Sequence, residues 1–391
     1  MTLLIKGADL YCPEHIGVND VLCVNGKVTE IAPSIDAASA RKIFPNIDIY
    51  DAEGLFCTPG IVDIHVHFNG AGGEGNPQFR TPPTQLSELT RAGITTAVGL
   101  LGTDGITRSL DDLYMKARGL QNEGISTWIW TGSYQIPSPT ITGNISRDIA
   151  VIDKMVGLKI AFSDHRSSHA NEGSFIESIA CSRIGGIVGG KSGKVMVHMG
   201  NPADGLARLR EILSHTQIPL SQLIPTHLNR CEALFRESII HGKAGGNIDL
   251  TAGVSEKYHF GGAVKPSTAV SRLISSGVPI EIITMSSDGN GAMSVPQADG
   301  ALKMLVSPVK AIYEEFVDML REGISYPDAI RVVSCNPAKA LGLLSKGKIA
   351  NGADADLLLI SKKDFSLKAV WALGEKMVED NVPIKKGVFE N

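Results

Sequence analysis

The stretch from Thr58 to Gly75, TPGIVDIHVHFNGAGGEG, constrains this chain more than any other. Its first half is an apolar, strand-like run that two histidines, His65 and His67, interrupt. A single histidine in such a run is more often a core residue bonded to backbone. Residues two apart in a strand share one face, and desolvating two imidazoles together costs free energy unless something binds their lone pairs. A divalent metal ion does so, and the stretch therefore predicts a metal-binding strand.

A glycine-rich segment follows this strand, with glycines at 70, 72, 73 and 75. Glycine is suited to loops where the backbone must approach a ligand closely. Glu74 lies inside this segment, and we expect it to face whatever binds there.

The composition is that of a globular protein. The chain has 391 residues, enough for a large α/β barrel with a small accessory module. A hydrophobic share of 43% and a charged share of 20% exclude a disordered chain. No apolar run approaches the roughly 18 residues that cross a bilayer. A net charge of −4 and the lack of a basic run argue against nucleic acid or an anionic membrane as the partner.

The N-terminus and the cysteines bear on the compartment. The first residues show no basic region followed by an apolar core and a cleavage site, which favours a cytoplasmic protein. The six cysteines include no C-x-x-C pair, so the sequence indicates neither a disulfide framework nor a cysteine-type zinc site.

Between residues 58 and 347, apolar β-like runs alternate with amphipathic stretches. The β-like runs are 61–68, 95–101, 127–133, 157–163, 194–199, 223–228, 247–252 and 282–287. The amphipathic stretches include 84–92, 110–123, 176–183, 205–216, 234–242 and 267–276, and further helices are expected at 307–323 and 327–344. Eight β-then-α units predict an α/β fold built on a closed (β/α)₈ TIM-like barrel, because a doubly wound sheet rarely reaches eight such repeats.

The two ends of the chain share a different texture of short strands and turns. Runs at 3–6, 20–24 and 27–31 match runs at 356–360, 367–372 and 375–378, and Asn25-Gly26 predicts a hairpin turn. We therefore expect residues 1–57 and 348–391 to pair into one small β-sandwich domain beside the barrel of residues 58–347.

Ionisable residues stand at the C-terminal ends of five of the expected strands, where such barrels hold their chemistry. They are His65 and His67 in the first strand, Lys159 in the fourth, His198 in the fifth, His227 in the sixth and Asp288 in the eighth. Any one of them could be a paired core residue. Six at corresponding places are unexpected in an interior otherwise filled by Val, Ile and Leu. Four histidines and an aspartate suit a divalent cation, and the imidazoles favour zinc.

Lys159 is unusual among these residues. An ammonium beside two cations would be repelled, so its pKa must lie far below the usual value of about 10.4. A neutral amine can react with carbon dioxide, and the resulting carbamate has two oxygens that could bridge two metal ions.

Taken together, the D-x-H-x-H strand end, the strand-borne lysine, the single histidines of strands five and six and the aspartate of strand eight resemble the binuclear amidohydrolase superfamily. More narrowly, six motifs resemble the isoaspartyl dipeptidases, and the likeness covers nearly the whole chain. They are 71–75, VGLLGTD at 98–104, TGSY at 131–134, SDHRS at 163–167, PTHLNR at 225–230 and SSDGNG at 286–291.

The resemblance implies a two-zinc peptidase. One zinc would be held by His65, His67 and Asp288 and the other by His198 and His227, with carboxylated Lys159 and a hydroxide between them. This hydroxide would be the nucleophile. Tyr134 would donate to the developing oxyanion, and Asp288 would carry the proton to the leaving amine. No organic cofactor is implied, and the expected assembly is a large homo-oligomer, such as an octamer.

The implied substrate is a small dipeptide with one ammonium and two carboxylates. Glu74 would bind the ammonium, and Arg166 and Arg230 would bind carboxylates. The loops at Gly72, Thr103 and Tyr134 would complete the substrate site.

The chain departs from the isoaspartyl dipeptidases at one substrate position. That family usually has a serine four residues after the metal aspartate, whereas Ala292 stands here. Either Ser294 or a water replaces the missing hydroxyl, or the protein binds β-aspartyl dipeptides more weakly or prefers a related acidic substrate.

Two other functions remain open. A cyclic-amide hydrolase of the dihydroorotase or hydantoinase type would share the metals, although Glu74, Arg166 and Arg230 better suit an open, charged dipeptide. A metal-free scaffold relative would keep only the barrel, and the complete ligand set argues against it.

Overall fold

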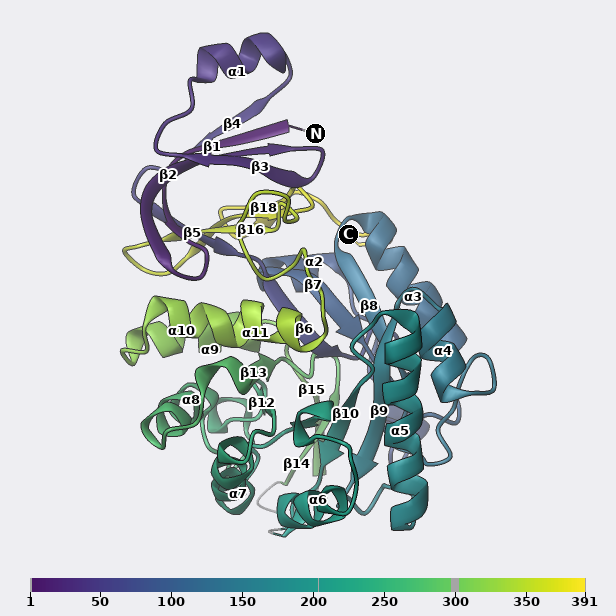
Figure 1. Cartoon of the computed structure of the whole chain (residues 1–391). Coiled ribbons are helices and arrows are strands. Elements are labelled where there is room, and N and C mark those ends of the chain that lie inside the picture. Colours follow the sequence, from purple (N-terminus) through teal and green to yellow (C-terminus); the bar gives the residue numbers. More distant parts are fainter. Residues whose placement is uncertain (1, 203, 297–301, 391) are drawn as a thin grey trace.

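The computed structural model describes residues 2–202, 204–296 and 302–390, and it has an α/β architecture with two sheets of different character. Figure 1 shows a terminal sheet, built from both ends of the chain, above the parallel strands. Helices α3 (Leu110–Glu123), α4 (Ile145–Val151) and α5 (Glu172–Gly189) lie outside strands β8 (Ser126–Gly132) and β9 (Met155–Phe162). Helices α8 to α11, within residues 266–340, lie on the opposite side. Within the described residues, no helix is long and apolar enough to cross a membrane.

The parallel strands follow the order expected from the sequence. They are β6 (Ile61–Val66), β7 (Ile94–Gly99), β8 (Ser126–Gly132), β9 (Met155–Phe162), β10 (Lys194–Met199), β11 (Leu223–Thr226), β12 (Ile248–Thr251) and β13 (Ile283–Ser286). Strands β6 to β11 form a six-stranded parallel half-barrel sheet, and β12 pairs with β13. Nearly all of their residues are buried, as expected for strands covered on both faces.

Helices follow these strands, and all but α4 correspond to the stretches for which the sequence predicts helices. They are α2 (Leu86–Arg91), α3 (Leu110–Glu123), α4 (Ile145–Val151), α5 (Glu172–Gly189), α6 (Gly205–Ser214), α7 (Glu232–Lys243), α8 (Pro266–Ser275) and α9 (Ala311–Arg321). The helix predicted at 327–344 consists of three consecutive segments in the structure. They are α10 (Tyr326–Ile330), a π-helical turn at Arg331–Cys335 and α11 (Asn336–Ala340).

The terminal sheet combines strands from both ends, as the sequence predicts. It contains β1 (Thr2–Tyr11), β2 (His15–Val24), β3 (Lys27–Ala32), β4 (Asp48–Asp51), β5 (Leu55–Pro59), β16 (Leu357–Ser361), β17 (Leu367–Ala372), β18 (Glu375–Glu379) and β19 (Val382–Pro383). The two ends meet where β5 pairs antiparallel with β16. Asn25 and Gly26 make the expected turn between β2 and β3. Such a two-residue turn requires positive φ at both positions, and these residues adopt φ of 51° and 76°.

Two short helices and one hairpin are among the elements that the sequence analysis did not predict. Helix α1 (Ala37–Ile43) and helix α4 have seven residues each, too short for a clear helical period. Their N-caps, Asp36 and Asn144, accept hydrogen bonds from the first turn and explain where they begin. The third is a hairpin of β14 (Ala292–Pro296) and β15 (Leu302–Val306), which extends over the site from the end of β13.

A buried histidine makes the stability of this fold pH-dependent. His241 in α7 is buried, and neither ring nitrogen has a hydrogen-bond partner within residues 2–202, 204–296 and 302–390. Burial lowers its pKa to about 4, from an unfolded value of about 6.5. Neutral His241 therefore contributes its full stability above pH about 6.5 and loses it as the pH falls toward 4, by about 1.4 kcal/mol per pH unit.

We expect His241→Phe to reduce the loss of stability at acid pH, since the variant has no imidazole to protonate at this position. Denaturant unfolding at pH 7 and pH 4.5 should show a drop in the free energy of unfolding that is smaller by roughly 2 kcal/mol in the variant. Equal drops in the two proteins would show that protonation of His241 does not limit acid stability.

Candidate active site

The ionisable residues of the strand ends meet at one place in the fold. His65 and Lys159 lie within β6 and β9, His198 lies within β10, and His227 directly follows β11. The imidazole rings form a chain, with centroids 5.6 Å apart for His65 and His67, 5.1 Å for His65 and His227, and 4.7 Å for His198 and His227. The C-terminal ends of parallel strands share one edge, which brings together residues far apart in sequence.

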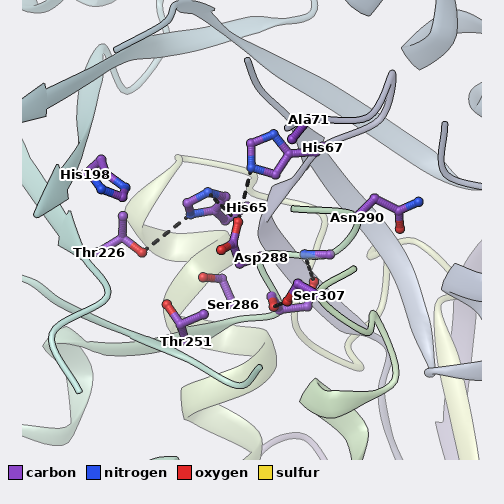
Figure 2. A network of polar contacts seen from close by, with 12 residues as sticks. His65, His67, Ala71, His198, Thr226, Thr251, Ser286, Asp288, Asn290 and Ser307 are labelled. Atoms are coloured by element: carbon purple, nitrogen blue, oxygen red, sulfur yellow. Dashed lines mark hydrogen bonds and ion pairs between the residues drawn. The ribbon is translucent and has the colours of Figure 1, made fainter. Parts of the chain in front are cut away.

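Three of these residues form a compact candidate metal centre. One ligand atom each from His65, His67 and Asp288 lies within 4.8 Å of the others. The Nε2 atoms of His65 and His67 lie 3.2 Å and 3.1 Å from Oδ1 of Asp288. Figure 2 shows both imidazoles directed at this carboxylate, with Thr226 beside His65.

His198 and His227 extend the centre on its other side. Nδ1 of His227 lies 2.7 Å from the hydroxyl of Thr251. In His198, Nδ1 lies 2.5 Å from the hydroxyl of Tyr134 and Nε2 lies 2.9 Å from Oδ2 of Asp164. Burial holds the pKa of both imidazoles well below the usual value, so both are neutral, the form that binds metal ions.

The donor set fits a divalent cation. The Lys159 amine is buried and has no hydrogen-bond partner in the described structure, and burial lowers its pKa to about 7. A buried amine without a partner is costly unless something else binds there. Nδ1 of His67 is likewise buried and unpartnered. Four imidazoles, a carboxylate and this amine are the residues that the sequence assigns to metal binding, and the structure brings all six together.

The charge states of the centre differ from those of free side chains. Burial lowers the pKa of His65 to about 3, so its imidazole is neutral and can donate Nε2–H to Asp288. Burial alone would raise the pKa of Asp288, but the interactions with His65 and His67 outweigh it and hold this pKa well below the usual range. The centre therefore presents an anionic carboxylate beside neutral imidazoles.

Two of these residues have strained backbones. His227 and Asp288 have φ of 67° and 53°, in the left-handed region that is uncommon for residues other than glycine. Such conformations persist only where the surrounding structure imposes them, and they concentrate at functional sites.

A cleft of about 770 Å³ lies over this centre. It is lined by every residue that the sequence assigns to substrate binding, namely Gly72, Glu74, Thr103, Tyr134, Arg166, Arg230 and Ala292. The structure thus places them together around the metal-binding side chains, and their individual roles stay predictions.

Asp164 is a site residue that the sequence analysis missed. It lies two positions after the end of β9. Its carboxylate forms a bidentate pair with Arg166, because Oδ1 accepts from Nε at 2.9 Å and Oδ2 accepts from Nη2 at 3.0 Å. Nη1 of Arg166 donates to Oε1 of Glu74 at 3.1 Å. The position of Asp164 at a strand end, inside the SDHRS motif, is the signal that could have identified it.

Arg230 also lines the cleft. Its Nη1 donates to the carbonyl of Met199 at 2.8 Å, while its buried Nε has no hydrogen-bond partner among the described residues. The guanidinium lies 5.8 Å from the ring centroid of Phe260. It is therefore fixed on one side and retains donor capacity for an anionic ligand.

Ala292 lies where the glycine loop and the β14–β15 hairpin meet. A Cβ on Gly72, which has φ of 78°, would lie 3.0 Å from Cβ of Ala292. Glycine at 72 thus permits this close approach, and the methyl group of Ala292 faces the cleft without a hydroxyl. The side chain of Ser294 lies outside the described parts of the structure.

Comparison with known proteins identifies the family of this chain. Residues 209–381 match the model of the amidohydrolase family. The β-aspartyl dipeptidase of Fervidobacterium islandicum AW-1, solved in complex with the β-Asp-Leu dipeptide, is 38% identical over 98% of both chains, with a TM-score of 0.89. The chain belongs to the β-aspartyl dipeptidase family. This finding confirms the family that the sequence motifs indicate.

Other relatives show how far the fold extends beyond the β-aspartyl dipeptidase family. The D-hydantoinase of a Thermus species is 16% identical with a TM-score of 0.73 over 100% of this chain and 98% of its own, a likeness of fold alone. The dihydroorotase of Listeria monocytogenes is 34% identical over 109 residues. This match spans 28% of the present chain and 23% of the dihydroorotase.

Proposed function

We propose that this chain hydrolyses the β-aspartyl, or isoaspartyl, peptide bond of dipeptides. The observation that carries the proposal is the cleft over the His65–His67–Asp288 centre, which is lined by the Glu74 carboxylate and by the guanidinium groups of Arg166 and Arg230. A β-aspartyl dipeptide has the complementary set of one ammonium and two carboxylates. The relative solved with β-Asp-Leu supports the same substrate class.

We propose two zinc ions as the cofactors. His65, His67 and Asp288 would hold one ion, and His198 and His227 the other, with carboxylated Lys159 between them. The unpartnered Lys159 amine and its lowered pKa support this assignment. Such ions polarise the scissile carbonyl and lower the pKa of water to near neutrality.

The side chains of the chain supply the remaining chemistry. The anionic carboxylate of Asp288 accepts a proton from the attacking water and delivers it to the nitrogen of the leaving amino acid. Burial raises the pKa of Tyr134, so its hydroxyl stays protonated and can donate to the oxygen of the attacked carbonyl. His198, 2.5 Å from this hydroxyl, helps to orient it.

Substrate orientation follows from the charges that line the cleft. Arg166, held by Asp164, presents a fixed guanidinium to one substrate carboxylate, and Arg230, held by the carbonyl of Met199, presents another. Glu74 pairs with Arg166 in the described structure and would pair with the substrate ammonium when substrate binds. Thr103 and the backbone at Gly72 add polar groups at the rim.

A cyclic-amide hydrolase is the second candidate, favoured by the local match to dihydroorotase and by the hydantoinase-like fold. The metal-loaded protein should be assayed with β-Asp-Leu, α-Asp-Leu, dihydrouracil and hydantoin. We expect turnover of β-Asp-Leu well above that of the other three. Comparable hydrolysis of the cyclic amides would favour the second candidate, and less than two metal ions per active chain would contradict the proposed centre.

Two variants test the placement of the substrate. Arg230→Ala should raise KM for β-Asp-Leu by at least about tenfold, because a hydrogen bond to a charged group is worth about 1.5–3 kcal/mol. Ala292→Ser should raise kcat/KM, because it adds a donor at the rim of the cleft. Steady-state kinetics that leave both variants at wild-type values would place the substrate on the other side of the centre.

We also propose the finer architecture expected from the sequence. A parallel bridge between Val66 and Gly289 and a hydrogen bond from Leu228 N to Asp249 O, at 3.2 Å, support closure of the eight strands into one (β/α)₈ barrel over residues 58–347. Residues 1–57 and 348–391 would form the β-sandwich domain.

An apolar stripe on α5 supports the proposal that the chain forms a homo-oligomer. The stripe consists of the exposed side chains of Ile184, Ile187 and Val188.

A further inference from the structure

The loop that carries Glu74 is rich in glycine and is held by contacts of its own and by contacts from a neighbouring loop. It spans residues 69–81 after β6, and four of its glycines have positive φ. Its regular structure includes a 3-10 turn at Pro77–Phe79 and an antiparallel bridge between Gly72 and Arg80. Glycine-rich backbone has high conformational entropy, so further contacts at its base restrict the loop.

Arg108 supplies this support from the neighbouring loop, between β7 and α3. Its side chain is 8% exposed. It donates from Nη1 to the carbonyl of Asn69, and from Nη2 to the carbonyls of Ala71 at 3.0 Å and Thr81 at 3.2 Å. These three carbonyls lie on both chain sides of Glu74, so one guanidinium links the two ends of the loop, where Thr81 N also donates to the carbonyl of Ala71 at 2.8 Å.

The contact is built for a guanidinium. Gly70 has φ of 81°, and a Cβ there would lie 3.1 Å from Nη2 of Arg108 and 2.3 Å from the carbonyl of Thr81. Glycine thus makes room for the close approach. Within the described residues, the carboxylate near Arg108 is Asp104, whose Oδ2 lies 3.9 Å from Nε, beyond hydrogen-bond distance. The donors of Arg108 are therefore directed into the loop backbone.

Arg80 forms a second, weaker link between the same loops. Its Nη1 donates to Oδ2 of Asp104 at 3.0 Å, but the side chain is 38% exposed. Exposed ion pairs contribute little, whereas a buried guanidinium with three carbonyl partners is costly to remove. Of these two arginines, the buried Arg108 therefore contributes more to the order of the loop.

We propose that Arg108 is a positioning residue for substrate recognition. By closing the base of the 69–81 loop, it holds the Glu74 carboxylate in the cleft, where it selects substrates that carry an α-ammonium group. This inference rests on the proposed function, because it assigns the ammonium of the substrate to Glu74.

The test compares β-Asp-Leu with N-succinyl-leucine, which is the same molecule without its α-amino group. Wild type should prefer β-Asp-Leu in kcat/KM by at least about tenfold, the scale of a hydrogen bond to a charged group. Arg108→Met should lose most of this preference, with kcat/KM for N-succinyl-leucine and metal content near wild type. Arg108→Lys, which keeps one charged donor, should be intermediate. Arg118→Met, on the exposed face of α3, is the matched control.

Hydrogen–deuterium exchange gives a readout independent of turnover. Residues 70–80 should exchange faster in Arg108→Met than in wild type and in Arg118→Met, while 286–291 should not change. An equal loss of activity toward both compounds, or unchanged exchange in the loop, overturns the proposal. If Arg108→Met fails to fold, Arg108→Lys decides by the same two measurements. A wild type that cleaves neither compound would refute the proposed function, and the exchange comparison would still decide whether Arg108 orders the loop.

Discussion

Lys159→Ala should abolish both metal binding and turnover while leaving the fold intact. The Lys159 amine is fully buried in β9 and has no hydrogen-bond partner in the described structure, so its removal breaks no hydrogen bond of the fold. A carbamate on this amine would give the position a favourable role, since a buried amine without a hydrogen-bond partner is costly. We expect metal analysis of the purified variant to fall far below two ions per chain, with β-Asp-Leu hydrolysis falling below detection.

A matched control separates this effect from the loss of any strand lysine. Lys194 begins the neighbouring strand β10 at its opposite end and donates to the carbonyl of Ser221. Lys194→Ala should keep metal and activity. Added short-chain carboxylic acids with zinc should partly restore turnover in Lys159→Ala, because they supply the missing anion. Two bound metals and full activity in Lys159→Ala would refute the proposal that a carbamate on Lys159 holds the metal ions.

The strand-end residues could be predicted because the apolar pattern that identifies a buried strand is local and periodic in the sequence. The run around Ile160 and the run around Val197 are apolar and bounded by turn residues, which fixes them as buried strands. Once the β-then-α order is known, the C-terminal ends of the strands must share an edge. Lys159 and His198, 39 positions apart in the sequence, are therefore neighbours in space, and the observed pairing of β9 with β10 confirms this.

The loop contacts could not be predicted in the same way. Asp164 and Arg108 depend on the path of irregular backbone, and no period in the sequence encodes which carbonyl or guanidinium they will meet. A buried arginine between two loops looks in sequence like any surface arginine. The same holds for the β14–β15 hairpin, which brings Ala292 against Gly72 through contacts that only the folded chain reveals.

Asp288→Asn should separate proton transfer from metal holding. Asparagine keeps one oxygen in the place of Oδ1, which lies 3.2 Å from His65 and 3.1 Å from His67, but its amide cannot accept a proton at neutral pH. The backbone at 288 has φ of 53°, and asparagine tolerates this left-handed conformation as well as aspartate does. The substitution therefore changes the chemistry with little change in geometry.

We expect kcat for β-Asp-Leu to fall by at least about 10²-fold in Asp288→Asn, the usual scale for the loss of a general base. Metal content should fall much less than in Lys159→Ala.

Asp354→Asn is a useful control, because this buried carboxylate pairs with Lys346 at 2.9 Å outside the cleft, and its loss should lower stability without changing kcat. A kcat within about threefold of wild type in Asp288→Asn would assign the proton shuttle to another group. Of the residues that line the cleft, Asp164 and Glu74 are the remaining carboxylates, and Asp164 is already committed to Arg166 and His198. Glu74 would then be the next candidate for the base.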